Sequence, residues 1–295
     1  MRKNKRQNNR TPSAASQKSQ RAALSRFWSM SIAICLLGCI FALIFASVMG
    51  YVPAPKKQKA APTPTPEVMG SSEADAAPTA TPTPRPIQKS NSGAALAQTA
   101  DGGLDYLNAI YFFGDGSLDA LNTENLLFGD ERDHQVWMPN SGVLDLNVLS
   151  STLYRSPVTG NDVAASEVVQ VNQPKYVILL PSADNVKDVS ASAIQSAYTT
   201  MISDILLENS ETVIILSSLT PVAADCEDAD NETINTVNGY IAAAAEANDV
   251  YYLDAAYDIA DSDGNLPANL TDDGMHLNAD GVKNWLDIVM THVPG

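Results

Sequence analysis

Two segments that lie far apart in the sequence carry residues able to act together in hydrolysis. Asp273 stands three residues before His276 in the segment LTDDGMHLNADG. An imidazole held by a nearby carboxylate has a fixed tautomer and acts as a general base. Far upstream, the apolar run of AIYFFGDGSL ends in a Gly-Asp-Gly turn followed by Ser117. The two segments together predict a hydrolytic site made of Ser117, Asp273 and His276.

The segments that position these residues alternate between strand and helix patterns. Short apolar and β-branched runs predict strands at residues 109–113, 135–138, 176–180, 212–217 and 250–253, and two helices are predicted at residues 190–209 and 232–248. Strands without polar alternation that are separated by helices indicate a parallel sheet covered on both faces. We therefore expect an α/β fold with a parallel sheet of about five strands. Active sites in such sheets lie beyond the carboxyl ends of the strands, which is where Ser117 follows the first strand.

Charge is distributed unevenly along the 295 residues. Residues 1–26 hold eight Lys or Arg and no acid, whereas residues 101–295 hold five basic and 31 acidic residues, a formal charge of −26. This strongly acidic part makes nucleic acid an unsuitable partner. Its length of 195 residues is that of one domain with a sizeable core.

Residues 27–49 form an uncharged apolar stretch of 23 residues, and a helix needs about 20 to cross a bilayer. We expect one transmembrane helix, with the basic tail of residues 1–26 in the cytoplasm and the acidic domain outside. A cleaved signal peptide is the main alternative, although the run is longer than a signal core. Lipidation at Cys39, within a sequence that resembles a lipoprotein processing box, is a further alternative.

Residues 50–100 are rich in Pro, Thr and Ala, with APTPTP at residues 61–66 and TATPTPRP at residues 79–86. Such a composition is too poor in large apolar residues to pack and favours an extended, disordered stalk. The stalk resembles the spacers of Gram-positive surface proteins. The predicted folded domain therefore spans residues 101–295, outside the cell membrane.

No metal or other cofactor is expected. Cys226 is the only thiol beyond the apolar stretch, so no disulfide forms within the domain. Zinc needs clustered ligands, and we expect His134 and His292 to be structural or exposed residues apart from His276. Residues 261–264 resemble part of a calcium loop but lack the remaining ligands, so they predict a turn.

Four separated blocks within residues 104–293 resemble the SGNH, or GDSL, hydrolase superfamily. They are FFGDGSL, the segment from Asn140 to Gly142, YVILLPSADN, and the segment from Asp273 to His276. The resemblance implies a flavodoxin-like, three-layer α/β/α domain that hydrolyses esters. It also implies a serine nucleophile in the first block, an oxyanion-binding backbone N–H at Gly142, and an Asp-His pair in the last block.

Two departures from the family pattern concern the chemistry. Aligned without gaps, the nucleophile position holds Gly116, and Ser117 reaches it only if the glycine is an insertion. The alternative role for Ser117 is the N-cap of a helix. In the third block, Ala183 replaces the asparagine that donates to the oxyanion, and Asn185 is a candidate substitute two residues later.

Two hypotheses follow from these residues. The first is an ester hydrolase of the cell envelope that acts on O-acyl groups of wall glycans. The second is a catalytically degenerate domain kept as a binding or scaffolding module in the envelope, which Gly116 and Ala183 favour. In both hypotheses the chain contacts the membrane through its N-terminal helix, and the substrate expected of the hydrolase is an ester or a glycan.

The charge asymmetry makes the topology testable. Protease added to intact cells is expected to remove the domain by cleavage between residues 52 and 100, and to leave a membrane fragment with a protected basic tail. Immunoblotting with antibodies against each end of the chain measures this. A protected domain, or a secreted protein whose N-terminus lies beyond residue 49, would contradict the predicted topology.

Overall fold

The computed structural model describes residues 87–129 and 132–295. The basic tail, the apolar stretch of residues 27–49 and most of the predicted stalk lie outside the described residues. Within the described part of the chain, no helix is both long enough and apolar enough to cross a membrane.

Five parallel strands form the central sheet. In chain order they are β1 (Ile110–Gly114), β2 (Val136–Trp137), β5 (Tyr176–Leu180), β6 (Val213–Ser217) and β7 (Tyr251–Leu253). Their spatial order is β2-β1-β5-β6-β7, so the strand order reverses between β1 and β5. This is the order of a flavodoxin-like, doubly wound sheet. The predicted α/β class and the five parallel strands are confirmed.

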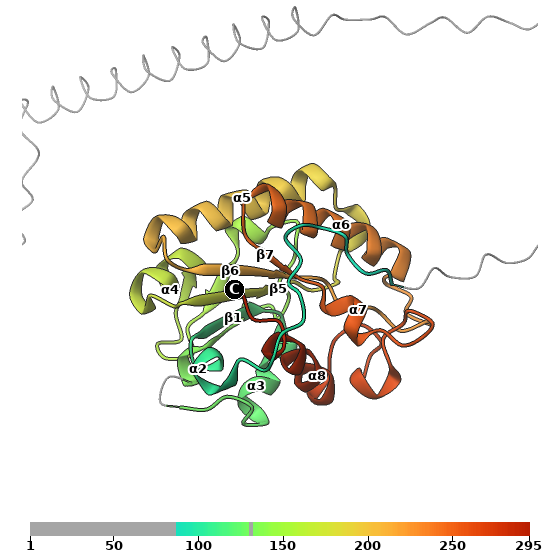
Figure 1. The fold of residues 1–295 in the computed structure, drawn as a ribbon, viewed down its shortest axis with the longest axis horizontal. Helices are drawn as coiled ribbons and strands as arrows, with labels where there is room; N and C mark the ends of the chain where they lie inside the picture. The colour runs from blue at the N-terminus through green and yellow to red at the C-terminus, as the bar shows by residue number, and fades with distance from the viewer. Residues whose placement is uncertain (1–86, 130–131) are drawn as a thin grey trace, which may run out of the picture. The chain divides into compact units, whose positions relative to one another are not determined.

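Helices cover both faces of this sheet and complete three layers (Figure 1). One face carries α4 (Ala165–Asn172), α5 (Ala191–Glu208) and α6 (Asn231–Ala247), and the other carries α2 (Gly103–Leu107), α3 (Ala120–Thr123) and α8 (Ala279–Met290). Alternate residues of β1 pack into the two hydrophobic cores, one on each face of the sheet. Phe113 lies in the core on the α5 side, and Phe112 lies in the core on the α8 side. This double burial explains why the strands appear as continuous apolar runs.

The predicted helices at residues 190–209 and 232–248 correspond to α5 and α6. Each begins at a side-chain cap, because Ser190 accepts the N–H of Ala193 and Asp230 accepts the N–H of Thr233. The sequence patterns do not predict α4, α8, the short helix α7 (Ala255–Ile259), or the antiparallel hairpin of β3 (Leu153–Arg155) and β4 (Asp162–Ala164).

Residues 87–100, which we call the edge segment, pack on the domain although the sequence assigns them to the stalk. The N–H of Leu96 donates to the Tyr252 carbonyl and the N–H of Tyr252 donates to the Ala94 carbonyl, so this segment pairs with the outer edge of β7. Ile87 is buried against the core. The last proline of the stalk precedes this segment, so the backbone N–H groups needed for strand pairing are present. The predicted boundary at residue 100 is therefore wrong, and the domain includes residues 87–100.

The edge segment is expected to contribute measurably to stability. Burial of a side chain as large as Ile87 is worth about 2 kcal/mol, and its loss also exposes the edge of β7. A domain that starts at residue 101 should therefore unfold at a lower urea concentration than one that starts at residue 87. Equal urea midpoints for the two domains would contradict this packing role.

Candidate functional site

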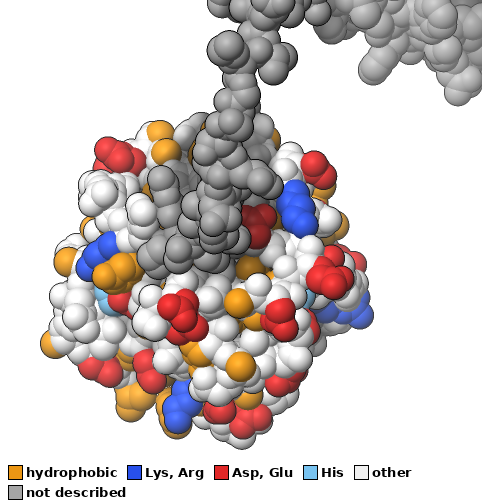
Figure 2. Space-filling view, turned by 90° about the vertical axis from the view of Figure 1, so that its right-hand side faces the viewer, with side chains coloured by type: hydrophobic (Ala, Val, Ile, Leu, Met, Phe, Trp, Pro, Cys, Tyr) orange, Lys and Arg blue, Asp and Glu red, His pale blue; other side chains and the backbone are white. Residues whose placement is uncertain are grey.

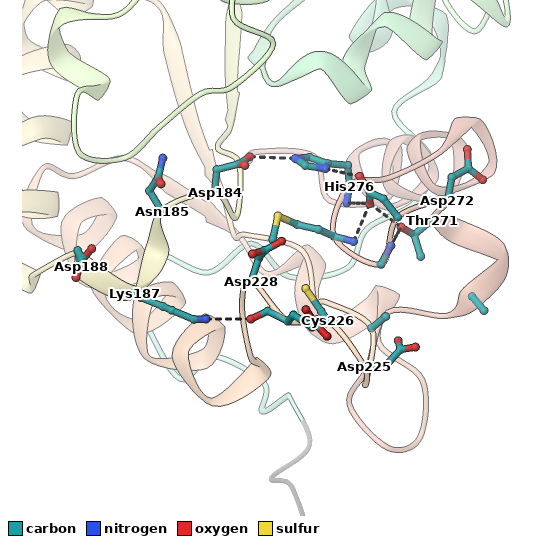
Figure 3. A pocket seen from close by; sticks show the side chains of 16 residues that line it. Asp184, Asn185, Lys187, Asp188, Asp225, Cys226, Asp228, Thr271, Asp272 and His276 are labelled. Carbon is teal, nitrogen blue, oxygen red and sulfur yellow. Dashed lines mark hydrogen bonds and ion pairs between the residues drawn. The ribbon is translucent and has the colours of Figure 1, made fainter.

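The candidate site lies at the edge of the sheet where β1 and β5 end. Asp115 directly follows β1, and Asp184 lies four residues beyond β5. The two strands are neighbours, with Gly114 opposite Leu180, so the loops that follow them meet at this edge. The loop before α8 brings His276 to the same place, as Figure 3 shows for His276 and Asp184.

The ring of His276 lies between two carboxylates. Its Nδ1 is 2.8 Å from Asp273 Oδ2, and its Nε2 is 3.0 Å from Asp184 Oδ2. The other oxygen of Asp273 accepts the backbone N–H groups of Met275 and His276, both at 2.8 Å. The structure therefore brings together Asp273 and His276, the pair that the sequence singles out. It adds Asp184 at the nitrogen that a serine nucleophile would use.

The carboxylates and the imidazole shift one another's proton affinity. Partial burial acts to lower the pKa of His276, but hydrogen bonds to Asp273 and Asp184 and the nearby charge of Asp115 raise it to about 9. Partial burial opposes ionisation of Asp273 and Asp184, yet their hydrogen bonds hold the pKa of each below its usual range. At neutral pH the ring is therefore an imidazolium between two anions.

Asp115 differs from these two carboxylates because it is almost fully buried. Burial raises the pKa of Asp115 to about 6. Two effects act in the opposite direction: the hydrogen bond that the Ser117 N–H donates to Asp115 at 2.9 Å, and the charge on His276. Asp115 is the N-cap of the short 3-10 turn at Gly116–Asp119. The expectation that Ser117 is a helix N-cap is therefore wrong, because the residue two positions earlier takes that place.

Gly116 and Ser117 occupy different environments. Gly116 is exposed, and its backbone is not in the left-handed region that favours glycine. A Cβ added there would lie 3.4 Å from the nearest atom, the Gly142 carbonyl oxygen, so the position has room for a side chain. The Oγ of Ser117 is buried and makes no hydrogen bond to His276, and its side chain acts instead to lower the pKa of Asp115. The structure does not bring the predicted nucleophile Ser117 to the predicted base.

The predicted oxyanion donors are engaged elsewhere. The N–H of Gly142 donates to the Pro139 carbonyl at 2.9 Å, and the carbonyl of Gly142 accepts the N–H of Gly116 at 2.7 Å. Ala183 offers no side-chain donor. The side-chain amide of Asn185, the candidate substitute, donates to Asp145 at 3.0 Å. Each of these backbone or side-chain donors therefore already has a partner within the protein.

A cleft of about 1110 Å³ opens beside His276 and Asp184 (Figure 3). Seven carboxylate side chains line it, from Asp184, Asp188, Asp225, Glu227, Asp228, Asp272 and Asp273. The ammonium group of Lys187 donates to the Glu227 carbonyl at 3.2 Å. Figure 2 views this edge of the sheet and shows acidic side chains spread over the face. Such a field disfavours anionic ligands.

The other polar residues singled out in the sequence lie outside this arrangement. His292 contacts the Ile288 carbonyl at 2.8 Å, and the His134 carbonyl accepts the indole N–H of Trp137. Residues 261–264 form the predicted turn, in which the N–H of Gly264 donates to the Asp261 carbonyl at 3.0 Å. In the part of the chain that the structure describes, no group of His, Cys, Asp or Glu is arranged to hold a metal ion.

The sequence motifs alone assign no role to Asp115 or Asp184. A signal for both was present, because each carboxylate closely follows a predicted strand of one parallel sheet. Carboxyl ends of neighbouring parallel strands meet at one edge. The missing information was that these two strands are neighbours, which depends on the strand order.

Residues 147–283 match the GDSL-like Lipase/Acylhydrolase family. These residues carry a GDSL-like domain. The matched part of this GDSL-like protein includes Asp184, Asp273 and His276, and it begins after Gly116 and Gly142. No curated protein matches this chain.

Solved structures similar to this GDSL-like protein share little sequence with it. A GDSL-like lipase from Bacteroides thetaiotaomicron is 15% identical, with a TM-score of 0.42, and the match covers 67% of this chain and 89% of that one. A carbohydrate esterase family 3 protein from Talaromyces cellulolyticus is 15% identical, with a TM-score of 0.38 and coverage of 61% and 93%. The C-terminal domain of Drosophila Oskar is 14% identical, with a TM-score of 0.41 and coverage of 68% and 93%.

The raised pKa of His276 makes the stability of this GDSL-like domain depend on pH. Because the folded-state value of about 9 exceeds the ordinary value of 6.5, the stabilisation from the charged ring is fully present below about pH 6.5. It is lost as the pH rises through about 9. The difference in free energy of unfolding between the wild type and His276→Asn should therefore shrink between these two pH values. Urea unfolding of both proteins across the range measures it, and a difference that stays constant would contradict the ion-pair assignment.

Proposed function

We propose that this GDSL-like domain is catalytically degenerate and serves the cell envelope as a binding or scaffolding module. The state of the nucleophile-base pair is the observation that supports the proposal. The position that directly follows Asp115 holds Gly116, which has no nucleophilic side chain, and Nε2 of His276 is bound by Asp184. Both members of the nucleophile-base pair are therefore unavailable to a substrate.

The expected loss of catalytic rate is large. Removal of the nucleophile from a serine hydrolase costs on the order of 10⁶-fold, and loss of one oxyanion donor costs roughly 10²- to 10³-fold. A general base must also be unprotonated to accept a proton, whereas the pKa of His276 is raised to about 9. These three effects act on the same step, so the arrangement favours a role without turnover.

The envelope role is supported by the sequence before residue 87. The basic tail, the apolar stretch and the Pro-Thr-rich stalk predict an anchored domain held away from the membrane. The edge segment begins at the edge of the sheet that holds the carboxyl ends of the strands. There the N–H of Gln88 donates to Asn235 near the start of α6, and the N–H of Ser90 donates to Asp254 just after β7. In an anchored protein the chain would therefore join the domain at the same edge as the cleft.

A second candidate function is an ester hydrolase that acts on O-acyl groups of wall glycans. The Asp273–His276 hydrogen bond at 2.8 Å and the match to the acylhydrolase family favour it. In this mechanism Ser117 attacks the ester carbonyl, His276 takes and returns the proton, and Asp273 orients the ring. It requires the hydroxyl of Ser117 to turn toward His276 and Asp184 to leave the ring.

A fluorophosphonate probe separates the two candidates. The wild-type protein should show no mass increase at Ser117 and no hydrolysis of an activated acetyl ester above background. The Ser117→Ala variant should behave in the same way, because the buried hydroxyl takes no part in catalysis. An active serine esterase in the same assay serves as the positive control. Labelling of Ser117, with ester hydrolysis that both Ser117→Ala and His276→Ala abolish, would refute degeneracy and support the hydrolase.

A further inference from the structure

We infer that Asp184 is a second obstacle to catalysis, in addition to the missing nucleophile. Its carboxylate is hydrogen-bonded to Nε2 of His276, the nitrogen that a nucleophile at position 116 would need. This inference rests on the proposed degeneracy and extends it. The domain lacks a nucleophile, and in addition its base is held by a residue of the same chain. Asp184 is in this sense an internal inhibitor, and restoration of a serine alone should not restore activity.

Several contacts hold Asp184 in place at the ring. Its side chain is 28% exposed, and the same oxygen that meets His276 also accepts a hydrogen bond from the hydroxyl of the buried Ser182. The N–H of Ser182 in turn donates to the Leu144 carbonyl at 3.1 Å. Asn185, the next residue after Asp184, has left-handed backbone and is hydrogen-bonded through its side chain to Asp145 at 3.0 Å. The loop is therefore anchored on both sides of Asp184.

A serine at position 116 would compete with the Asp184 carboxylate for Nε2 of His276, and the carboxylate would form the stronger hydrogen bond. Hydrogen bonds between ionised partners are roughly twice as strong as those between neutral groups. The contact between His276 and Asp184 joins an imidazolium to a carboxylate, whereas a serine hydroxyl offers a neutral partner to a neutral ring. The raised pKa of His276 agrees with this preference, since Asp184, Asp273 and Asp115 all favour the charged ring.

The geometry at position 116 shows that the missing serine is not excluded by space. A Cβ there meets only atoms of Gly142, at 3.4 Å or more, and the backbone suits any residue. Gly116→Ser should therefore fold. What such a variant lacks is a free base, which gives the inference a direct test.

The test compares Gly116→Ser, Gly116→Ser with Asp184→Ala, and Gly116→Ser with Asp188→Ala in the full chain. Asp188 is the matched control, because it lines the same cleft, is exposed and makes no hydrogen bond to His276. The rate of fluorophosphonate labelling at residue 116 should rise at least roughly tenfold when Asp184 is removed, since an opposite charge this close typically moves a pKa by one unit or more. Removal of Asp188 should leave the rate of the single variant unchanged.

Imidazole NMR supplies a readout that does not depend on activity. The protein has only three histidines, and His276→Asn identifies the resonance of His276. Removal of Asp184, but not of Asp188, should lower the pH at which this ring titrates. If Asp184→Ala does not fold, Asp184→Asn keeps the size of the side chain and removes its charge, and it replaces the alanine variant in both measurements.

The labelling rates and the His276 titration can each contradict the inhibitory role of Asp184. Labelling of Gly116→Ser as fast as that of its Asp184→Ala derivative would overturn it. So would an unreactive double variant whose His276 titrates at a lower pH, or a His276 titration that Asp184 does not affect. Wild-type labelling at Ser117 would instead refute the proposed function, so the two failures are distinguishable.

Discussion

Parallel strands β1 and β5 are neighbours, so the loops that leave their carboxyl ends must share a small volume at one edge of the sheet. Asp115 and Asp184 lie in those two loops, and burial raises the pKa of Asp115, with a smaller contribution from the charge of Asp184. Neighbouring like charges disfavour each other's ionised form, and a nearby cation favours it. His276 lies beside both loops, and its charge acts to lower the pKa of Asp115 and of Asp184. The chemistry of the site follows from this constraint.

An imidazole used in this way is poorly suited to general-base catalysis. In a serine hydrolase one ring nitrogen is held by a carboxylate and the other faces the nucleophile. Here both nitrogens meet carboxylates, with Asp273 at 2.8 Å and Asp184 at 3.0 Å. The exposed Gly116 leaves Nε2 without a serine partner, and the anchored loop around Asp184 supplies a charged one. In the proposed degenerate domain, the missing nucleophile and the hydrogen-bonded base would both act against catalysis.

The rest of the fold positions this edge. The strands of the sheet centre are buried on both faces, and side-chain caps at Ser190, Asp230 and Asn278 set where α5, α6 and α8 begin. The cap at Asn278 lies two residues after His276, so the start of α8 also fixes the loop that carries the ring. The edge segment covers the outer side of β7 and protects a three-residue strand that would otherwise expose unpaired backbone groups.

Much of the fold could be predicted from the sequence alone. The five strands and the helices α5 and α6 were predictable because continuous apolar runs and long amphipathic segments are local signals. Shorter elements such as α4 and the hairpin of β3 and β4 were missed, since a few residues carry little periodicity and tertiary packing stabilises them. The edge segment was also missed, because its small residues resemble a linker, and its pairing partner Tyr252 lies 157 residues after Ala95 in the sequence.

For the site, the sequence by itself determined the residue types and the local spacing that joins Asp273 to His276. It also placed Gly116 after the first strand and Ala183 after the third. It did not determine which group is hydrogen-bonded to Nε2 of His276, because that contact joins residues 92 positions apart and depends on the strand order. Only the tertiary structure decided that Asp184 takes this nitrogen and that the hydroxyl of Ser117 stays buried. The reason is that proximity across neighbouring strands is a property of the packed sheet, which local sequence spacing does not encode.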